Sequence, residues 1–189
     1  MPDGSNTLLP PLASLMERAA ATPKTIALRE GSDPRVVSAA LKARNMGLAQ
    51  IILVGDTAAV QAEIATQGGD ASDVMIHDPN DTQLHDQCAA TYTDLRAKKG
   101  MTLEVAQRLV RDPLIFSALL VRLGYADGTV GGAVATTSDT VRAALHVIGK
   151  APEAAIVSSF FLMCLPVDHP LGTPAMVFSD CGMVIDPNA

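Results

Sequence analysis

A glycine pair followed by a hydroxyl-rich segment is the part of this sequence best suited to bind an anion. Gly131 and Gly132 follow a short predicted strand, and Thr136 and Thr137 precede a predicted helix. Glycines let a ligand approach the backbone, and free N–H groups at a helix start attract negative charge. Arg142, in the first turns of that helix, could add a charge-assisted contact to phosphate or carboxylate. These residue types predict an anion site, although the same pattern also forms tight turns before capped helices.

A second arginine, Arg96, lies near the end of a helix predicted over 82–99. Cations at that position complement the dipole of the helix end, so a structural role explains Arg96 equally well. The sequence has no GxGxxG fingerprint and no GK[ST] element, which excludes the common dinucleotide and P-loop motifs.

Histidines and cysteines give no recognisable site. His77, His85 and Cys88 match no zinc-ligand spacing, so no metal is predicted. The three cysteines, with Cys164 and Cys181 the other two, form neither a CxxC pair nor a disulfide framework. A reducing compartment, and hence the cytoplasm, is the expectation.

Composition excludes several classes of partner. Fourteen Lys and Arg against twenty Asp and Glu give a net charge of -6, which disfavours nucleic acid because phosphate backbones need a basic surface. The longest apolar run, 156–167, is too short to span a bilayer, and 1–12 carries no basic residue before its apolar stretch. Neither a membrane protein nor a secreted one is predicted.

Strands and helices alternate around the candidate anion site. Gln50–Val54 is a continuous apolar run, as is typical of a buried parallel strand. Asp33 before Pro34, and Asp112 before Pro113, each predict a capped helix start. The alternation predicts an α/β protein with a parallel sheet. Strands are expected at 24–29, 50–54, 74–77 and near 125–130, and helices at 12–21, 34–45, 57–65, 82–99, 102–110, 113–123 and from 137.

A second sheet is predicted to begin near Ala151, with strands at 154–165 and 175–178. Two strands are too few to be stable alone. The expected organisation is therefore a first α/β domain over 1–150 and a truncated beginning of a second α/β domain over 151–189.

Several separate motifs in one order resemble the phosphate acetyltransferase/phosphate butyryltransferase family. They are Glu30-Gly-Ser-Asp-Pro-Arg35, Ile51-Ile-Leu-Val-Gly-Asp56, Leu95-Arg-Ala-Lys-Lys-Gly-Met-Thr102, Tyr125-Ala-Asp-Gly128, Gly131-Gly-Ala133 with Thr136-Thr137, and Phe178-Ser-Asp-Cys181. The resemblance implies reversible acetyl transfer between acetyl-CoA and inorganic phosphate, giving acetyl phosphate and CoA. It implies no metal or organic cofactor, coenzyme A being a substrate. It further implies a three-layer α/β/α fold similar to isocitrate and isopropylmalate dehydrogenases, with two domains, and a homodimer. The long span from Ala-Asp-Gly to Phe-Ser-Asp-Cys favours acetyl over butyryl.

The resemblance also assigns residues. Arg142 matches a family arginine that binds phosphate or acetyl phosphate, Arg96 matches another arginine of the cleft, and Cys181 matches a cysteine near it. Cys181 is interpreted as a cleft residue and not a nucleophile, since no histidine lies in a partner motif. The family's general base, an aspartate, and a Ser-Arg pair have no counterpart before Ala189. The candidates are Arg142 and Arg96 for catalysis, and Gly131, Gly132, Thr136, Thr137, Ser158 and Cys181 for substrate binding.

Other hypotheses remain open from the sequence. The transferred group could be butyryl, or the chain could be a catalytically incomplete piece that only binds phosphate or CoA. It could also be one module of a larger multifunctional protein. A dehydrogenase of similar fold would need an acidic metal cluster and a nicotinamide pocket, and no recognisable one is present.

Overall fold

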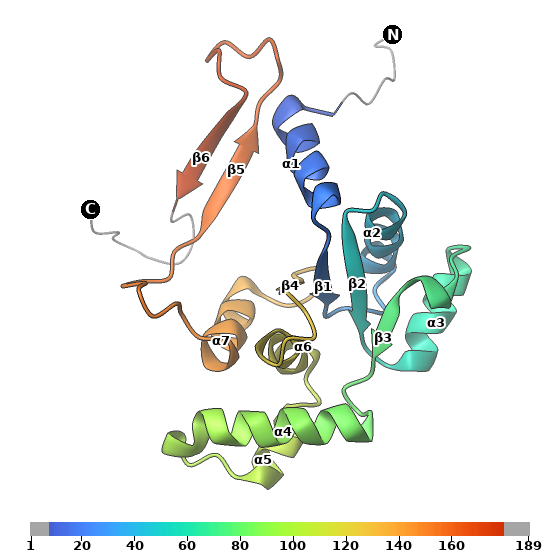
Figure 1. Cartoon of the computed structure of the whole chain (residues 1–189), viewed down its shortest axis with the longest axis vertical. Coiled ribbons are helices and arrows are strands. Elements are labelled where there is room, and N and C mark those ends of the chain that lie inside the picture. The colour runs from blue at the N-terminus through green and yellow to red at the C-terminus, as the bar shows by residue number, and fades with distance from the viewer. Residues whose placement is uncertain (1–7, 180–189) are drawn as a thin grey trace. The chain divides into compact units, whose positions relative to one another are not determined.

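The computed structural model describes residues 8–179 (Figure 1). Contacts within the chain separate two units. One comprises Thr22–Gly149, and the other joins the residues before Thr22 to those from Lys150 onward. Each unit is described by itself.

A four-stranded parallel sheet organises the unit Thr22–Gly149. Its strands lie in the order β3-β2-β1-β4. Leu28 on β1 pairs with Leu53 on one side and with Val130 on the other. The strands are β1 (Lys24–Leu28), β2 (Ala49–Val54), β3 (Met75–His77) and β4 (Gly128–Val130).

Helices connect these strands, and their starts follow the predicted capping chemistry. The side chains of Asp33 and Asp112 accept hydrogen bonds from backbone N–H groups of the first turns of α2 and α6. The predicted helix over 82–99 ends as an α-helix at Arg96, continues as a 3₁₀ turn, and stops at Gly100 with φ 76°. The helices are α2 (Pro34–Asn45), α3 (Thr57–Thr66), α4 (Thr82–Arg96), α5 (Leu103–Leu109), α6 (Pro113–Arg122) and α7 (Thr137–Val147), with 3₁₀ turns η1 (Ala71–Asp73) and η2 (Ala97–Lys99).

Both faces of the sheet are covered, which gives three layers. Successive residues of β2 point to opposite faces. Ile51 and Leu53 pack in a core with α2 and α3, whereas Ile52 and Val54 pack in a core with α4, α5, α6 and α7. The predicted α/β class, a parallel sheet flanked by helices, is confirmed.

The second unit contains a helix, α1 (Pro10–Ala21), and an antiparallel hairpin of β5 (Phe160–Cys164) and β6 (Ala175–Ser179). The strand predicted over 154–165 forms only from Phe160. The preceding backbone is used differently, because Lys150 Nζ donates to the carbonyls of Ala154 and Ala155 at 2.7 and 3.0 Å. These carbonyls accept hydrogen bonds from the lysine and not from a neighbouring strand.

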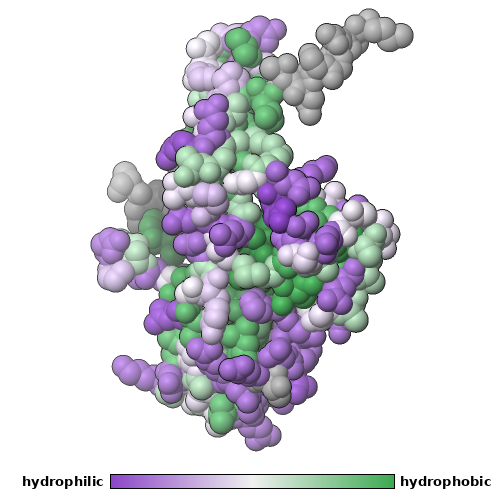
Figure 2. All heavy atoms as spheres, turned by 45° about the vertical axis from the view of Figure 1, so that its right-hand side comes forward, coloured by the Kyte–Doolittle hydropathy of each residue, from purple (hydrophilic) through white to green (hydrophobic). Residues whose placement is uncertain are grey.

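No residue of β5 or β6 is buried, although both strands are strongly apolar. Exposed apolar side chains are also visible between polar ones on the face that Figure 2 shows. The change of unit after Gly149 falls beside the predicted boundary at 150, but residues 8–21 group with the later segment. The assignment of two α/β domains stays a prediction. Within the described residues, no helix combines the length and apolarity needed to cross a bilayer.

Candidate functional site

The chain order of the sheet reverses between β1 and β4, which makes this position a topological switch point. From β1 the chain moves to β2 and β3 on one side, then returns to place β4 on the other side of β1. Open α/β sheets bind ligands at such a reversal, outside the carboxyl ends of the strands. Arg29 and Glu30 follow β1 at this point, and Gly131 and Gly132 follow β4. The topology therefore brings the predicted glycine loop to the expected place.

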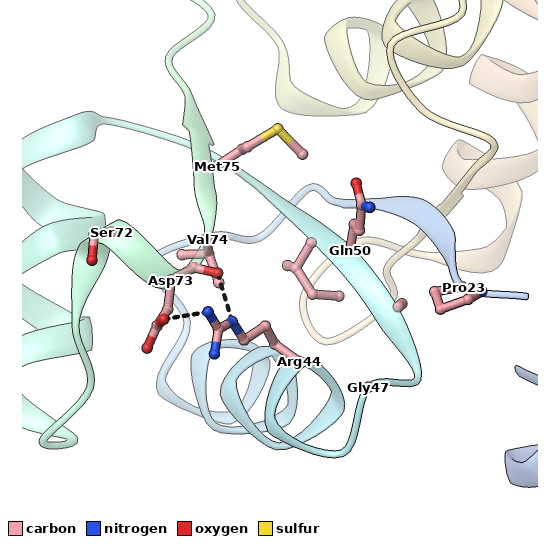
Figure 3. Close-up of a pocket in the computed structure, with 10 residues that line it drawn as sticks. Pro23, Arg44, Gly47, Gln50, Ser72, Asp73, Val74 and Met75 are labelled. Atoms are coloured by element: carbon pink, nitrogen blue, oxygen red, sulfur yellow. Dashed lines mark hydrogen bonds and ion pairs between the residues drawn. The ribbon is translucent and has the colours of Figure 1, made fainter. Parts of the chain in front are cut away.

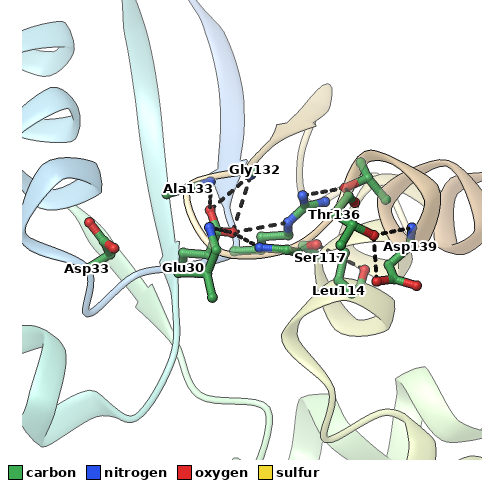
Figure 4. Close-up of polar contacts among 12 residues, drawn as sticks. Glu30, Asp33, Leu114, Ser117, Gly132, Ala133, Thr136 and Asp139 are labelled. Carbon is green, nitrogen blue, oxygen red and sulfur yellow. Dashed lines mark hydrogen bonds and ion pairs between the residues drawn. The ribbon is translucent and has the colours of Figure 1, made fainter. Parts of the chain in front are cut away.

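Glu30 fills the loop that follows β4 (Figure 4). Its Oε1 accepts hydrogen bonds from the backbone N–H groups of Val134 at 2.8 Å and Ala135 at 3.0 Å. Its Oε2 accepts from Ala133 at 3.0 Å and Gly132 at 3.1 Å. Four consecutive N–H groups of the predicted anion-binding loop thus face a carboxylate of the chain itself.

The loop determines the ionisation of this carboxyl group. Burial alone raises the pKa of Glu30, whose side chain is only 11% exposed. The four backbone N–H donors outweigh that effect and hold the pKa below its ordinary value of 4.5. Glu30 is therefore a carboxylate at neutral pH.

Arg29 lies beneath the loop and is 3% exposed. Its Nη2 donates to Thr140 Oγ1 in the first turns of α7, while its Nε has no hydrogen-bond partner among the described residues. A Cβ at Gly131 would come within 2.2 Å of that Nε. Glycine is required at 131 because the guanidinium occupies the space of a side chain.

Arg35 holds the loop from the side of α2. Its guanidinium donates to the carbonyl of Ala133 at 2.9 Å and to both carboxylate oxygens of Asp33 at 2.7 and 3.0 Å. The hydrogen bonds from Arg35 lower the pKa of Asp33 to about 2. The N–H groups of the loop are thus bound by Glu30, and the carbonyl of Ala133 is bound by Arg35.

The start of α7 carries the predicted hydroxyls. Thr136 is the N-cap, accepting from the N–H of Asp139 at 3.2 Å, and its hydroxyl donates to that carboxylate at 2.7 Å. Thr137 is the first helical residue. Arg142 is 62% exposed at its side chain and donates to Asp139 at 3.1 Å.

Arg142 and His146 line a hollow of about 270 Å³, together with Tyr92, Asp112, Leu114, Ile115, Asp139 and Ala143. Partial desolvation lowers the pKa of His146, and the positive charges of Arg96 and Arg142 lower it further. Arg96, from α4, and Arg142, from α7, therefore act on the same imidazole. The Nε of Arg96 is buried and lacks a hydrogen-bond partner among the described residues. Both predicted arginines therefore lie near His146, and of the two Arg142 lines the hollow.

The remaining candidates lie elsewhere. Ser158 is exposed and belongs to the unit from Lys150 onward, and Cys181 lies outside the described residues. Among the described residues, no three His, Cys, Asp or Glu side chains are grouped to hold a metal ion. His85, weighed as a ligand, instead bonds through Nε2 to the carbonyl of Gln107 at 2.7 Å.

A larger hollow of about 450 Å³ lies at the amino ends of β2 and β3 (Figure 3). Its arginine, Arg44, is bound to the carboxylate of Asp73 at 2.5 Å and to the carbonyl of the same residue at 3.1 Å. The guanidinium is therefore engaged by its neighbour. This end of the sheet is also opposite to the one where such folds bind ligands.

Four residues of the site were not singled out by the sequence-based prediction. Glu30 and Arg35 appear there only as parts of a family motif, Arg29 only as the end of a strand, and His146 not at all. The sequence signal that could have found Arg29 and Glu30 is their position directly after a buried strand, because such residues lie at the ligand-binding edge of a parallel sheet. Nothing in the local sequence indicates that Glu30 points toward a loop about a hundred residues away.

The fold and this surface define an α/β protein with a parallel sheet and two arginines near the imidazole of His146. Comparison with known proteins narrows the class. The family described as phosphate acetyl/butaryl transferase matches residues 12–189. The chain belongs to this family.

Individual relatives agree with that assignment. A phosphate acetyltransferase of Paracoccus denitrificans is 48% identical over 185 residues, covering 95% of this chain and 52% of the relative. One of Acetivibrio thermocellus is 38% identical over 180 residues, covering 94% of this chain and 53% of the relative. The crystal structure of a phosphotransacetylase from Streptococcus pyogenes superposes with a TM-score of 0.84 at 34% identity, covering 93% of this chain and 52% of that one. The chain spans about half the length of these relatives.

Proposed function

We propose that this protein is a phosphate acetyltransferase, which transfers an acetyl group reversibly between acetyl-CoA and inorganic phosphate. The observation that supports this most directly is the pair Arg96 and Arg142, which come from different helices and both act on the imidazole of His146, beside the hollow that Arg142 lines. Inorganic phosphate and acetyl phosphate are the anions that such a pair suits. The relatives' activity agrees with this chemistry.

The reaction assigns a role to these charges. Attack of phosphate on a thioester, or of a thiolate on an acyl phosphate, builds negative charge on the carbonyl oxygen. Fixed cations near that oxygen stabilise the transition state more than the ground state. In this proposal Arg142 binds the phosphate, Arg96 supports the developing charge, and Thr136, Thr137, Ser158 and Cys181 contribute to substrate binding. Gly131 and Gly132 shape the loop beside the site, whose N–H groups from residue 132 to 135 already donate to Glu30. Coenzyme A is a substrate, and neither a metal nor an organic cofactor is required.

The proposal includes a homodimer in the cytoplasm and acetyl in preference to butyryl. Light scattering tests the first of these. Release of CoA thiol from acetyl-CoA, set beside release from butyryl-CoA in the presence of phosphate, tests the acyl preference. A higher kcat/KM for butyryl-CoA would reassign the protein to the butyryl branch of the family.

Replacing Arg142 by alanine tests the phosphate site. Loss of one charge-assisted contact is expected to raise KM or Kd for phosphate roughly 10- to 100-fold. Arg108→Ala is the matched control, because Arg108 is exposed in the last turn of α5, away from the hollow. Unchanged phosphate dependence in Arg142→Ala would contradict the assignment.

A second candidate function is binding of phosphate or CoA without catalysis by this chain alone. The exposed apolar side chains of β5 and β6 favour it, because a complete domain would cover them. Phosphate binding without thiol release by the folded 189-residue chain would support this candidate. Thiol release by the same chain would exclude it.

A further inference from the structure

The loop after β4 already holds an anion, and the anion is part of the chain. A run of consecutive backbone N–H groups that converge on one point is an anion-binding concavity. In this loop the N–H groups of residues 132–135 all donate to the carboxylate of Glu30, at 2.8 to 3.1 Å for the shortest contact of each. Both carboxylate oxygens are used, so these four donors are already satisfied.

The carboxylate is also enclosed. The side chain of Glu30 is 11% exposed, and the Nε of the buried Arg29 lies 4.0 Å from its Oε1. Arg35 binds the carbonyl of Ala133 on the other side of the same loop. A negative charge that accepts from four N–H donors, with the guanidinium of Arg29 4.0 Å away, is held more firmly than an exposed ion pair.

The loop leads directly into α7. Ala135, whose N–H donates to Glu30, is followed by Thr136, the N-cap of α7, and Arg29 binds Thr140 one turn later. The direction in which α7 leaves the sheet therefore depends on the residues that follow β1. Arg142 and His146 lie on this helix.

We propose that Glu30 is a positioning residue, the resident anion of the loop 131–135, which fixes the start of α7 and directs a substrate phosphate to Arg142 instead of to the loop N–H groups. This inference rests on the proposed function in naming phosphate as the ligand. Its structural part, the occupation of the loop by Glu30, does not depend on catalysis.

Amide hydrogen exchange and chemical rescue test the proposal on the full 189-residue chain. Glu30→Ala removes the carboxylate, and exchange at residues 132–135 is expected to accelerate at least about tenfold, as loss of charge-assisted hydrogen bonds predicts. Added formate supplies a free carboxylate and is expected to restore the slow exchange. Glu17→Ala is the control, because Glu17 is exposed on α1, and neither change is expected there.

Phosphate provides the second readout. In the wild-type chain, titration with inorganic phosphate is expected to shift the side-chain N–H signals of Arg142 and to leave the amides of residues 132–135 unchanged. In Glu30→Ala, phosphate is expected to perturb those amides as well, because the emptied loop accepts an anion. A merely structural glutamate would show neither the formate rescue nor this gain of a phosphate response.

Three results would overturn the inference: wild-type exchange rates in Glu30→Ala, no rescue by formate, or phosphate shifts at residues 132–135 of the wild-type chain. If Glu30→Ala does not fold, a pH titration of the wild-type chain tests the inference instead. The carboxyl carbon of Glu30 and the loop amides must then titrate together, below the ordinary value of 4.5. Absence of any phosphate effect at Arg142 would instead reject the proposed phosphate site, while the exchange and rescue results would still judge Glu30.

Discussion

Two apolar strands of similar composition lie in opposite surroundings. Ile51-Ile-Leu-Val54 on β2 is buried at every residue, with exposures of 0 to 4%. Phe160-Phe-Leu-Met163 on β5 is exposed at every residue, with values from 38 to 69%. Both runs predict strands that are covered on both faces. Helical layers on both sides of β2 supply the cover, whereas β5 pairs only with β6 in the described part of the chain.

An apolar run indicates that a strand requires other elements packed on both faces, but the run does not determine whether those elements are present. The sheet of the unit Thr22–Gly149 has its own helices, so this unit satisfies the requirement internally. The hairpin is a two-stranded sheet, which is marginal by itself in water. Relatives twice as long have further sequence with which to cover such strands.

The largest expected effect comes from matched leucine truncations in the two strands. Leu53→Ala in the core of β2 is expected to lower the free energy of unfolding by about 2 to 5 kcal/mol, because it leaves a cavity. Leu162→Ala on β5 is expected to cost less than about 1 kcal/mol, since Leu162 is 38% exposed. Urea unfolding measures both. Equal losses would show that β5 is covered in solution, and the contrast between the strands would disappear.

Two glycines near β4, Gly131 and Gly128, test how tightly the first unit is packed at this point. Gly131→Ala is expected to cost about 1 to 3 kcal/mol, because the new methyl group meets the buried guanidinium of Arg29. Gly128→Ala is the control, where a Cβ has its nearest contact at 3.7 Å, and its stability is expected to stay within about 1 kcal/mol of the wild type. Thermal unfolding of the two variants distinguishes a close approach from a general preference for glycine.

Acid should weaken the first unit through Glu30. Because the folded-state pKa of Glu30 is depressed, its contribution to stability is fully present above the ordinary value of 4.5 and is lost as the pH falls through the folded pKa. Urea unfolding at a series of pH values is expected to show this loss in the wild type and less of it in Glu30→Gln. Parallel curves for the two proteins would mean that the loop does not hold the carboxylate in solution.

The smallest expected effect is a difference in alkylation rate between two cysteines, which reports how well each strand or helix is buried. Burial raises the pKa of Cys88, in the core on α4, to about 12, so its thiol is expected to resist alkylation in the folded protein. Cys164 at the end of β5 is only partly buried and is expected to react first. Mass spectrometry of the digested, labelled protein checks the order. Protection of Cys164 with prompt labelling of Cys88 would reverse the comparison.

The sequence is informative where a local pattern has a local cause. Capping aspartates and the apolar run of β2 predict the α/β unit because each acts on its own neighbours. Arg142 is predicted from the loop and helix pattern around it, whereas the assignment of Arg96 to the cleft depends on the family resemblance. The pattern overextends β5, because Lys150 occupies the carbonyls of Ala154 and Ala155. It misses the role of Glu30, because that role depends on strand order and not on neighbouring residues. The partners of Glu30 lie 102 to 105 positions away.

That separation in sequence has a consequence for how the molecule folds. The pairing of β1 with β2 closes a loop of about twenty-five residues, whereas the pairing of β1 with β4 must wait for roughly a hundred. Contacts between distant segments carry the larger entropic cost of closure and slow the folding of the chain. During synthesis, β1, β2 and β3 emerge long before β4 and the loop behind it. Glu30 is therefore expected to remain a solvated carboxylate until β4 pairs with β1, so the contact between Glu30 and the loop is expected to form late within this unit.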